Sequence, residues 1–230
     1  MMSLIVSVLA EVEVQAPLID VLSHFTEIDL VKTWFPQVTE CMVLKQVTDY
    51  RGLYFVQAAM PWPVWPRELV FKATGMLDKK NKGILIVAHS AQNDSDFFDY
   101  SVPETSEGYV RIDLKRCFHY FQQIGPNKTK YISITNADPK LTYMPNWFMN
   151  FITTKVSYQM LVQIQNRSSL VSENEYGIRI KERDHYYQRI RDLIYTLKQD
   201  DLDENQIQEE EKKEENKDSD TDEENFQDAQ

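Results

Sequence analysis

The chain opens with a run in which apolar and polar residues alternate. From Val8 to Val14 every second side chain is apolar, with Leu9, Glu11 and Glu13 between them. A period of two residues is typical of a β-strand that buries one face. We therefore predict a half-buried strand near the start of the chain.

The period changes to that of a helix over residues 15–36. Pro17 suits the first turn of a helix, and Val21 and Phe25 fall on the same helical face. A second short helix is expected to follow at about residues 28–35. These two helices need a sheet to cover.

Strand patterns return after Pro36. Turn segments with glycine separate them, as in "TDYRG" and "GPNKT", which predicts antiparallel hairpins. The last-but-one segment reads either as one long strand or as two strands with a break near Lys115. The six predicted strands cover residues 40–49, 52–60, 67–77, 84–91, 109–124 and 130–138.

A long helix is predicted after the last strand. Residues 143–164 carry large apolar side chains on more than one side, and Pro145 suits the first helical turn. A second helix is expected over residues 179–199. Because hairpins join the strands and the helices stand apart from them, we predict an α+β fold. In this fold a curved antiparallel sheet wraps around the long C-terminal helix.

The net charge of −11 is concentrated at the end of the chain. Residues 200–230 hold 15 Asp or Glu against 3 Lys, a charge of −12, so residues 1–199 carry about +1. So acidic and polar a segment cannot bury enough surface to fold. We predict a disordered tail that either binds a partner or only solubilises the protein. The neutral body argues against a nucleic-acid-binding protein.

Composition also indicates the cellular compartment of the protein. With 42% hydrophobic residues the body can form a core, yet no run approaches the ~18 uncharged apolar residues of a membrane span. The start of the chain lacks the basic flank of a signal peptide, and Cys41 and Cys117 are the two cysteines. These features favour a reducing, cytoplasmic setting.

Three motifs, in this order, resemble the START family of lipid-transfer domains. "AEVEVQAPLIDVLSHFTEIDLVKTWFPQV" is similar to the opening strand and helix pair of the family, and "WPVWPRELVF" to its "PRDFV" segment. "ITNADPKLTYMPNWFMNFITTKV" is similar to its last strand and lid helix. The resemblance covers about residues 4–170. It implies a helix-grip fold enclosing one hydrophobic, lipid-sized tunnel, with the C-terminal helix as lid.

The resemblance also implies domain boundaries and limits which lipid the protein would bind. It implies a START-like lipid-binding domain over residues 1–172, an appended helix over 173–199 and the acidic tail over 200–230. Sterol-binding members of the family carry a paired arginine and carboxylate. Ala73 and Tyr54 stand at those positions here, which weighs against a sterol and favours no other lipid.

The candidate binding residues follow from the proposed tunnel. An apolar lining accepts acyl chains because each buried methylene is worth ~0.8 kcal/mol. Arg67 is the candidate for orienting the ligand, since a guanidinium binds phosphate or carboxylate. The alternative for Arg67 is an ion pair with Glu68 or another neighbour. The predicted lipid-binding residues are Tyr54, Val56, Arg67, Phe71, Phe148, Phe151 and Ile152.

Aromatic residues near the expected tunnel mouth leave two interpretations open. Phe97 and Phe98 lie in the long polar stretch 92–108, where they either gate the tunnel and contact a membrane or pack back onto the sheet. Trp62 and Trp65 either anchor the rim or pack beneath a proline-rich loop.

Catalytic and metal-binding patterns are weak. The four histidines lack metal-ligand spacing, and the aspartates of residues 92–99 lack the glycine and glutamate of a calcium loop. Cys117 and His119 share a strand face, but no third group that would orient them is identifiable from sequence. We predict a protein that is not an enzyme and uses no cofactor or metal.

Three functional hypotheses remain. The first is a monomer that binds a lipid and moves it between membranes through transient membrane contact; the lipid is a phospholipid, a sterol or another class. The second is a helix-grip enzyme, such as a cyclase or hydrolase, that uses the same cavity. The third is a partner-binding module that acts through residues 180–198 and the acidic tail.

Overall fold

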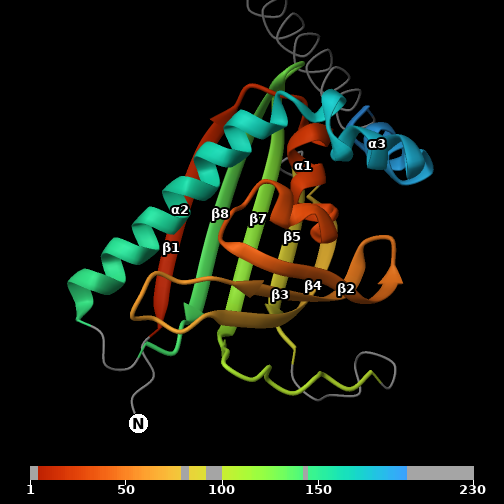
Figure 1. Ribbon diagram of the computed structural model, residues 1–230. Helices are drawn as coiled ribbons and strands as arrows, with labels where there is room; N and C mark the ends of the chain where they lie inside the picture. Colours follow the sequence, from red (N-terminus) through yellow and green to blue (C-terminus); the bar gives the residue numbers. More distant parts are fainter. Residues whose placement is uncertain (1–4, 79–82, 92–99, 142–144, 196–230) are drawn as a thin grey trace, which may run out of the picture. The chain divides into compact units, whose positions relative to one another are not determined.

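A computed structural model describes residues 5–78, 83–91, 100–141 and 145–195 (Figure 1). The chain divides into two compact units, residues 1–187 and residues 188–230. In the second unit, the described residues 188–195 are helical. Phe97, Phe98 and the predicted acidic tail lie outside the described residues.

The first unit is built on one antiparallel sheet, as the sequence predicts. In the described residues the strand order is β1-β8-β7-β5-β4-β3-β2, and a two-residue strand, β6, pairs in parallel with β4. Figure 1 shows β2 and β3 lying across the direction of β1, β8 and β7, so the sheet is curved. The strands are β1 (Val6–Val14), β2 (Val38–Thr48), β3 (Arg51–Ala58), β4 (Arg67–Asp78), β5 (Gly83–Ser90), β6 (Val110–Arg111), β7 (Asp113–Gly125) and β8 (Lys128–Asp138).

The helices occupy the predicted places in the chain order. The pair after β1 and the long helix after β8 follow Pro17 and Pro145, which take the N-cap positions directly before the first helical residues. The segment expected as one helix over 179–199 is interrupted at Arg183, and residues 184–195 are again helical. The helices are α1 (Leu18–Thr26), η1 (Ile28–Thr33), α2 (Asn146–Ser168), η3 (Val171–Glu173) and α3 (Glu175–Glu182).

Helices α1, η1 and α2 cover the same, inner face of the sheet. Phe25 of α1 lies on the ring of Tyr131, with centroids 5.0 Å apart. Ile28 of η1 packs against the inner side of the sheet. Ile152 of α2 packs with Val6 of β1 in a further buried cluster. The helix-grip arrangement predicted from the sequence is thus present.

Residues 171–187 extend this unit past α2 and pack on α1 and η1. Tyr176 of α3 stacks on His24, with ring centroids 4.4 Å apart. Gly177 permits the close approach of α3 to η3, because an added Cβ would collide with the carbonyl oxygen of Val171. Glu27 is fully buried and binds side chains of this extension.

Candidate functional site

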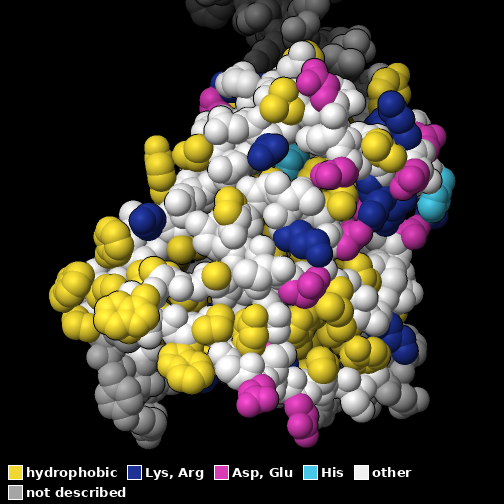
Figure 2. All heavy atoms as spheres, viewed as in Figure 1, with side chains coloured by type: hydrophobic (Ala, Val, Ile, Leu, Met, Phe, Trp, Pro, Cys, Tyr) yellow, Lys and Arg dark blue, Asp and Glu magenta, His cyan; other side chains and the backbone are white. Residues whose placement is uncertain are grey.

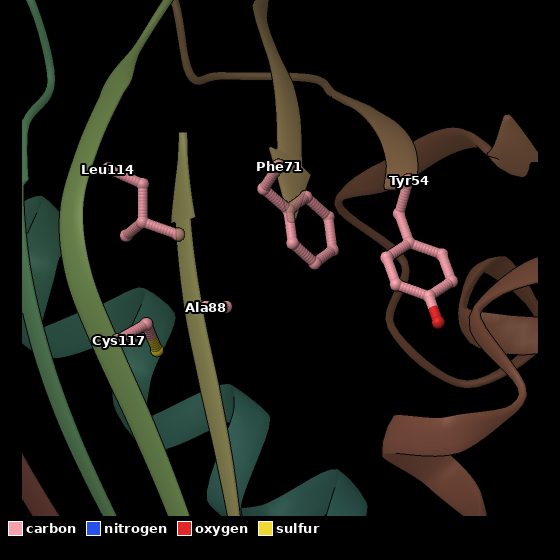
Figure 3. Packing of buried hydrophobic residues seen from close by; sticks show 5 residues of the cluster. All are labelled: Tyr54, Phe71, Ala88, Leu114 and Cys117. Carbon is pink, nitrogen blue, oxygen red and sulfur yellow. The ribbon is translucent and has the colours of Figure 1, made fainter. Parts of the chain in front are cut away.

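A buried apolar cluster occupies the inner face of the sheet. Tyr54 and Phe71 are direct cross-strand partners, which brings their ring centroids to 5.4 Å. Val56 packs at the edge of the same cluster. Three of the predicted lining residues are therefore brought together. The buried members, shown in Figure 3 extending from four strands, are Tyr54, Phe71, Ala88, Leu114 and Cys117.

A row of small residues crosses the middle of this face. Strand pairing aligns Gly52, Ala73, Ala88, Cys117 and Thr135 on the adjacent strands β3, β4, β5, β7 and β8. A well-packed interior is filled mainly by large aliphatic side chains. These side chains project little from the middle of the face, and the ring of Tyr54 covers Gly52. We name these five residues the small-residue row.

A second buried cluster joins the start of α2 to the β3–β4 loop. Val64 of the loop is buried together with Met149 and Ile152 of α2, and Phe148 packs against them. Ile152 and Phe148 are thus on the inner side of α2. Phe151 is placed differently from the expectation, because 56% of its surface is exposed.

Arg67 is buried at the start of β4 and makes its contacts with main-chain carbonyls. Its Nε donates to the oxygen of Pro139 at 3.0 Å and its Nη1 to that of Trp65 at 2.6 Å, and Nη2 reaches Lys140 at 3.4 Å. Arg67 therefore links the β3–β4 loop to the turn after β8. The carboxylate of Glu68 pairs with Arg111 instead.

A chain of polar side chains continues from the apolar cluster along β7 and β8. The Sγ atom of Cys117 lies 3.2 Å from Thr135 Oγ1 and 3.2 Å from His119 Nε2. The other ring nitrogen, Nδ1, lies 2.8 Å from the Tyr131 hydroxyl. We name Tyr131, His119, Cys117 and Thr135 the polar chain. The sequence shows that these residues alternate along two strands, but the strand register was needed to bring them into contact.

The environment of the polar chain argues against nucleophilic catalysis. Burial raises the pKa of the Cys117 thiol and lowers the pKa of His119 to about 4. Both groups are therefore neutral at neutral pH, whereas a cysteine nucleophile requires the thiolate. The arrangement is suited to hydrogen bonding rather than to a covalent step.

Large aromatic side chains are exposed around the start of α2. Trp62 and Trp65 of the β3–β4 loop are exposed, the former to 91%, and Trp147 of α2 to 70%. Figure 2 shows hydrophobic side chains gathered over this end of α2. The Lys155 ammonium lies 5.7 Å from the centroid of the Phe151 ring. We name Trp62, Trp65, Trp147 and Phe151 the aromatic surface.

None of the described helices is both long enough and apolar enough to cross a membrane. In the same part of the chain, no group of three or more His, Cys, Asp or Glu side chains is arranged to hold a metal ion.

Comparison with known proteins assigns the family. Human STARD10 is similar in fold, with a TM-score of 0.63 and 14% identity over 77% of this chain and 66% of its own. Human StAR-related lipid transfer protein 5 has a TM-score of 0.63 and 16% identity, and the match covers 73% of this chain and 77% of that protein. A StAR-related lipid transfer protein of Xanthomonas axonopodis has a TM-score of 0.55 and 18% identity, and the match covers 71% of this chain and 85% of that protein. No curated protein matches the sequence. The family model described as START domain matches residues 7–170, and the chain therefore belongs to the START domain family.

Proposed function

We propose that this domain binds one lipid in a hydrophobic tunnel between the inner face of the sheet and α2, and carries it between membranes. Helix α2 would act as the lid, and the protein would work as a cytoplasmic monomer that contacts membranes transiently. The observation that carries the proposal is the small-residue row, in which the side chains of Ala73, Ala88 and Cys117 project little from the sheet where an acyl chain would lie.

Accessible surface on the inner face supports the same proposal. Val56, Ala73, Thr135 and Ala137 keep part of their surface accessible although helices cover this face. Close packing would bury such residues completely. An acyl chain filling the space would gain ~0.8 kcal/mol for each buried methylene.

In this proposal Arg67 supports the tunnel rather than binding a charged headgroup. Three of its N–H groups already donate to carbonyl oxygens, and a phosphate would have to replace them. The names of two similar structures, human StAR-related lipid transfer protein 5 and the Xanthomonas protein, favour a lipid as the cargo.

Replacing Ala88 with Trp is expected to reduce lipid binding at least tenfold while the protein stays folded. Ala88 lies in the middle of the small-residue row, so the indole would occupy the space proposed for the acyl chain. Binding is measured by incubating the protein with vesicles of total cell lipid extract and quantifying protein-bound lipid by mass spectrometry.

The apo stability of this variant separates a tunnel from a filled core. Forcing an indole into a filled core costs about 1–3 kcal/mol or more, whereas an open space accepts it at little cost. The matched control is His89→Trp, at the next position, which is exposed. Wild-type protein that takes up no lipid, or an Ala88→Trp variant that binds as well as wild type, would overturn the proposal.

The aromatic surface is expected to make the membrane contact. Tryptophan side chains favour the membrane–water interface, and a basic group such as Lys155 adds attraction to anionic lipids. Replacing Trp62 and Trp147 with Ser should each lower partitioning onto vesicles of phosphatidylcholine and phosphatidylserine by about tenfold. Vesicle co-sedimentation measures this effect.

A control variant tests whether removing any exposed apolar side chain lowers vesicle partitioning. Leu9 is 69% exposed on β1, away from the aromatic surface, and Leu9→Ser should leave partitioning unchanged. Equal losses in all three variants would contradict a localised membrane surface.

A further inference from the structure

We propose that the polar chain is the headgroup site of the tunnel and selects lipids with an uncharged hydroxyl headgroup, such as a long-chain alcohol, a diacylglycerol or a sterol. The inference rests on the proposed function, because it names the chemical class of the lipid. It would place the ligand hydroxyl at Thr135 and Cys117 and its apolar body along the small-residue row.

Position is the first argument. Cys117 belongs both to the apolar cluster and to the polar chain, so the polar groups begin where the apolar surface ends. Phe25 of α1 lies over the far end, with its ring centroid 4.8 Å from that of His119 and 5.0 Å from that of Tyr131. A ligand would therefore reach the chain at its Thr135 end.

Hydrogen-bonding capacity is the second argument. A hydroxyl offers one donor and two acceptor sites, and Thr135 Oγ1 has Cys117 Sγ as a described side-chain partner. The chain supports two proton arrangements. Either Tyr131 donates to His119 and His119 to Cys117, or both bonds run the other way. Thr135 can thus act as donor or acceptor toward a ligand. This matches a ligand hydroxyl, which is also both a donor and an acceptor.

Charge is the third argument. On the described positions of β1, β3, β4, β5, β7 and β8 that share this face, Arg67 is the one Lys or Arg. Three of its five N–H groups donate to main-chain carbonyls. The thiol and imidazole of the chain are neutral at neutral pH. Burying a phosphate or carboxylate beside neutral groups is costly, whereas an uncharged hydroxyl is satisfied by one or two hydrogen bonds.

The test compares lipids that differ only in the hydroxyl. Affinities of the wild-type protein are measured for 1-hexadecanol and its methyl ether, and in parallel for cholesterol and its methyl ether and for a diacylglycerol and the matching triacylglycerol. We expect at least one alcohol to bind about tenfold more tightly than its partner. The arm that shows the preference identifies the kind of lipid. Hexadecyl phosphate should bind more weakly than 1-hexadecanol.

A variant locates the preference. Thr135→Val keeps the shape but removes the hydroxyl, and should bring each pair to within about twofold without changing affinity for the methyl ether. Thr74→Val, at a β4 position on the opposite face, should keep the preference. Equal affinity within every pair in wild-type protein, or a preference that survives in Thr135→Val, would overturn the headgroup assignment alone. Failure to bind any of these lipids would also overturn the headgroup assignment, whereas only a failure to take up any lipid from the total cell extract would overturn the proposed function.

Discussion

Replacing Glu27 with Ala is expected to lower the free energy of unfolding by about 3–5 kcal/mol, the usual cost of breaking a buried ion pair. Only 1% of the Glu27 side chain is exposed. Its carboxylate accepts bonds from Arg183 Nη1 at 2.6 Å, Arg179 Nη1 at 3.0 Å and the Tyr187 hydroxyl at 2.6 Å. Its loss would remove the carboxylate that Arg183 binds, while Arg179 would keep Asp29 and the Tyr187 hydroxyl would keep Thr26 Oγ1.

Urea unfolding at neutral pH measures this effect, and Asp29→Ala is the matched control. Asp29 also binds Arg179, but its side chain is 38% exposed, so an effect below about 1 kcal/mol is expected. Similar losses in the two variants would show that burial of Glu27 contributes little. The same contacts hold residues 171–187 on α1. A shortened protein for binding studies should therefore end after residue 195 and not before α3.

Lowering the pH is expected to destabilise the protein already at pH values well above those at which carboxylates titrate. Burial lowers the pKa of His24 and of His119 from 6.5 to about 4. Below pH 6.5 the unfolded chain takes up protons that the folded protein does not, so stability falls as the pH drops from 6.5 to 4. Each histidine accounts for roughly 2 kcal/mol of this loss at pH 5.

Urea midpoints at pH 7.5, 6 and 5 test this expectation. His119→Gln and His24→Gln should each remove about half of the loss between pH 7.5 and 5, whatever their effect at pH 7.5. His185→Gln, at a side chain that is 73% exposed, is the control for replacing a histidine outside the core. A wild-type stability that is flat between pH 7.5 and 5 would contradict burial of the two imidazoles as neutral groups.

Much of the fold was readable because its signals are local. Alternation along β1, glycine-containing turns between the hairpin strands, and proline before α1 and α2 each act within a few residues. These patterns together predicted the order of the elements, and the resemblance to START domains then indicated the family. The break at Arg183 was missed, since the apolar spacing on both sides of it favours one continuous helix.

The candidate site was only partly predictable. Tyr54, Val56 and Phe71 were predicted together because strand periodicity assigns them to one face. Phe151 was assigned to the lining but is exposed. The apolar face of α2 is broad, and spacing alone does not decide which part of a broad face meets the sheet. That choice depends on where Val6 and Val64 stand in the folded chain.

By itself, the sequence determined the α+β class, the strand and helix order, the acidic end of the chain and the lipid-transfer family. The class, the order and the charge depend on composition and on contacts between near neighbours, whereas the family was indicated by the resemblance of three motifs. Only the tertiary structure decided that Arg67 binds carbonyls, that Glu27 meets Arg179 and Arg183, and that His119 lies between Cys117 and Tyr131. Each of these depends on strand register or on packing between residues far apart in sequence, which no local pattern encodes.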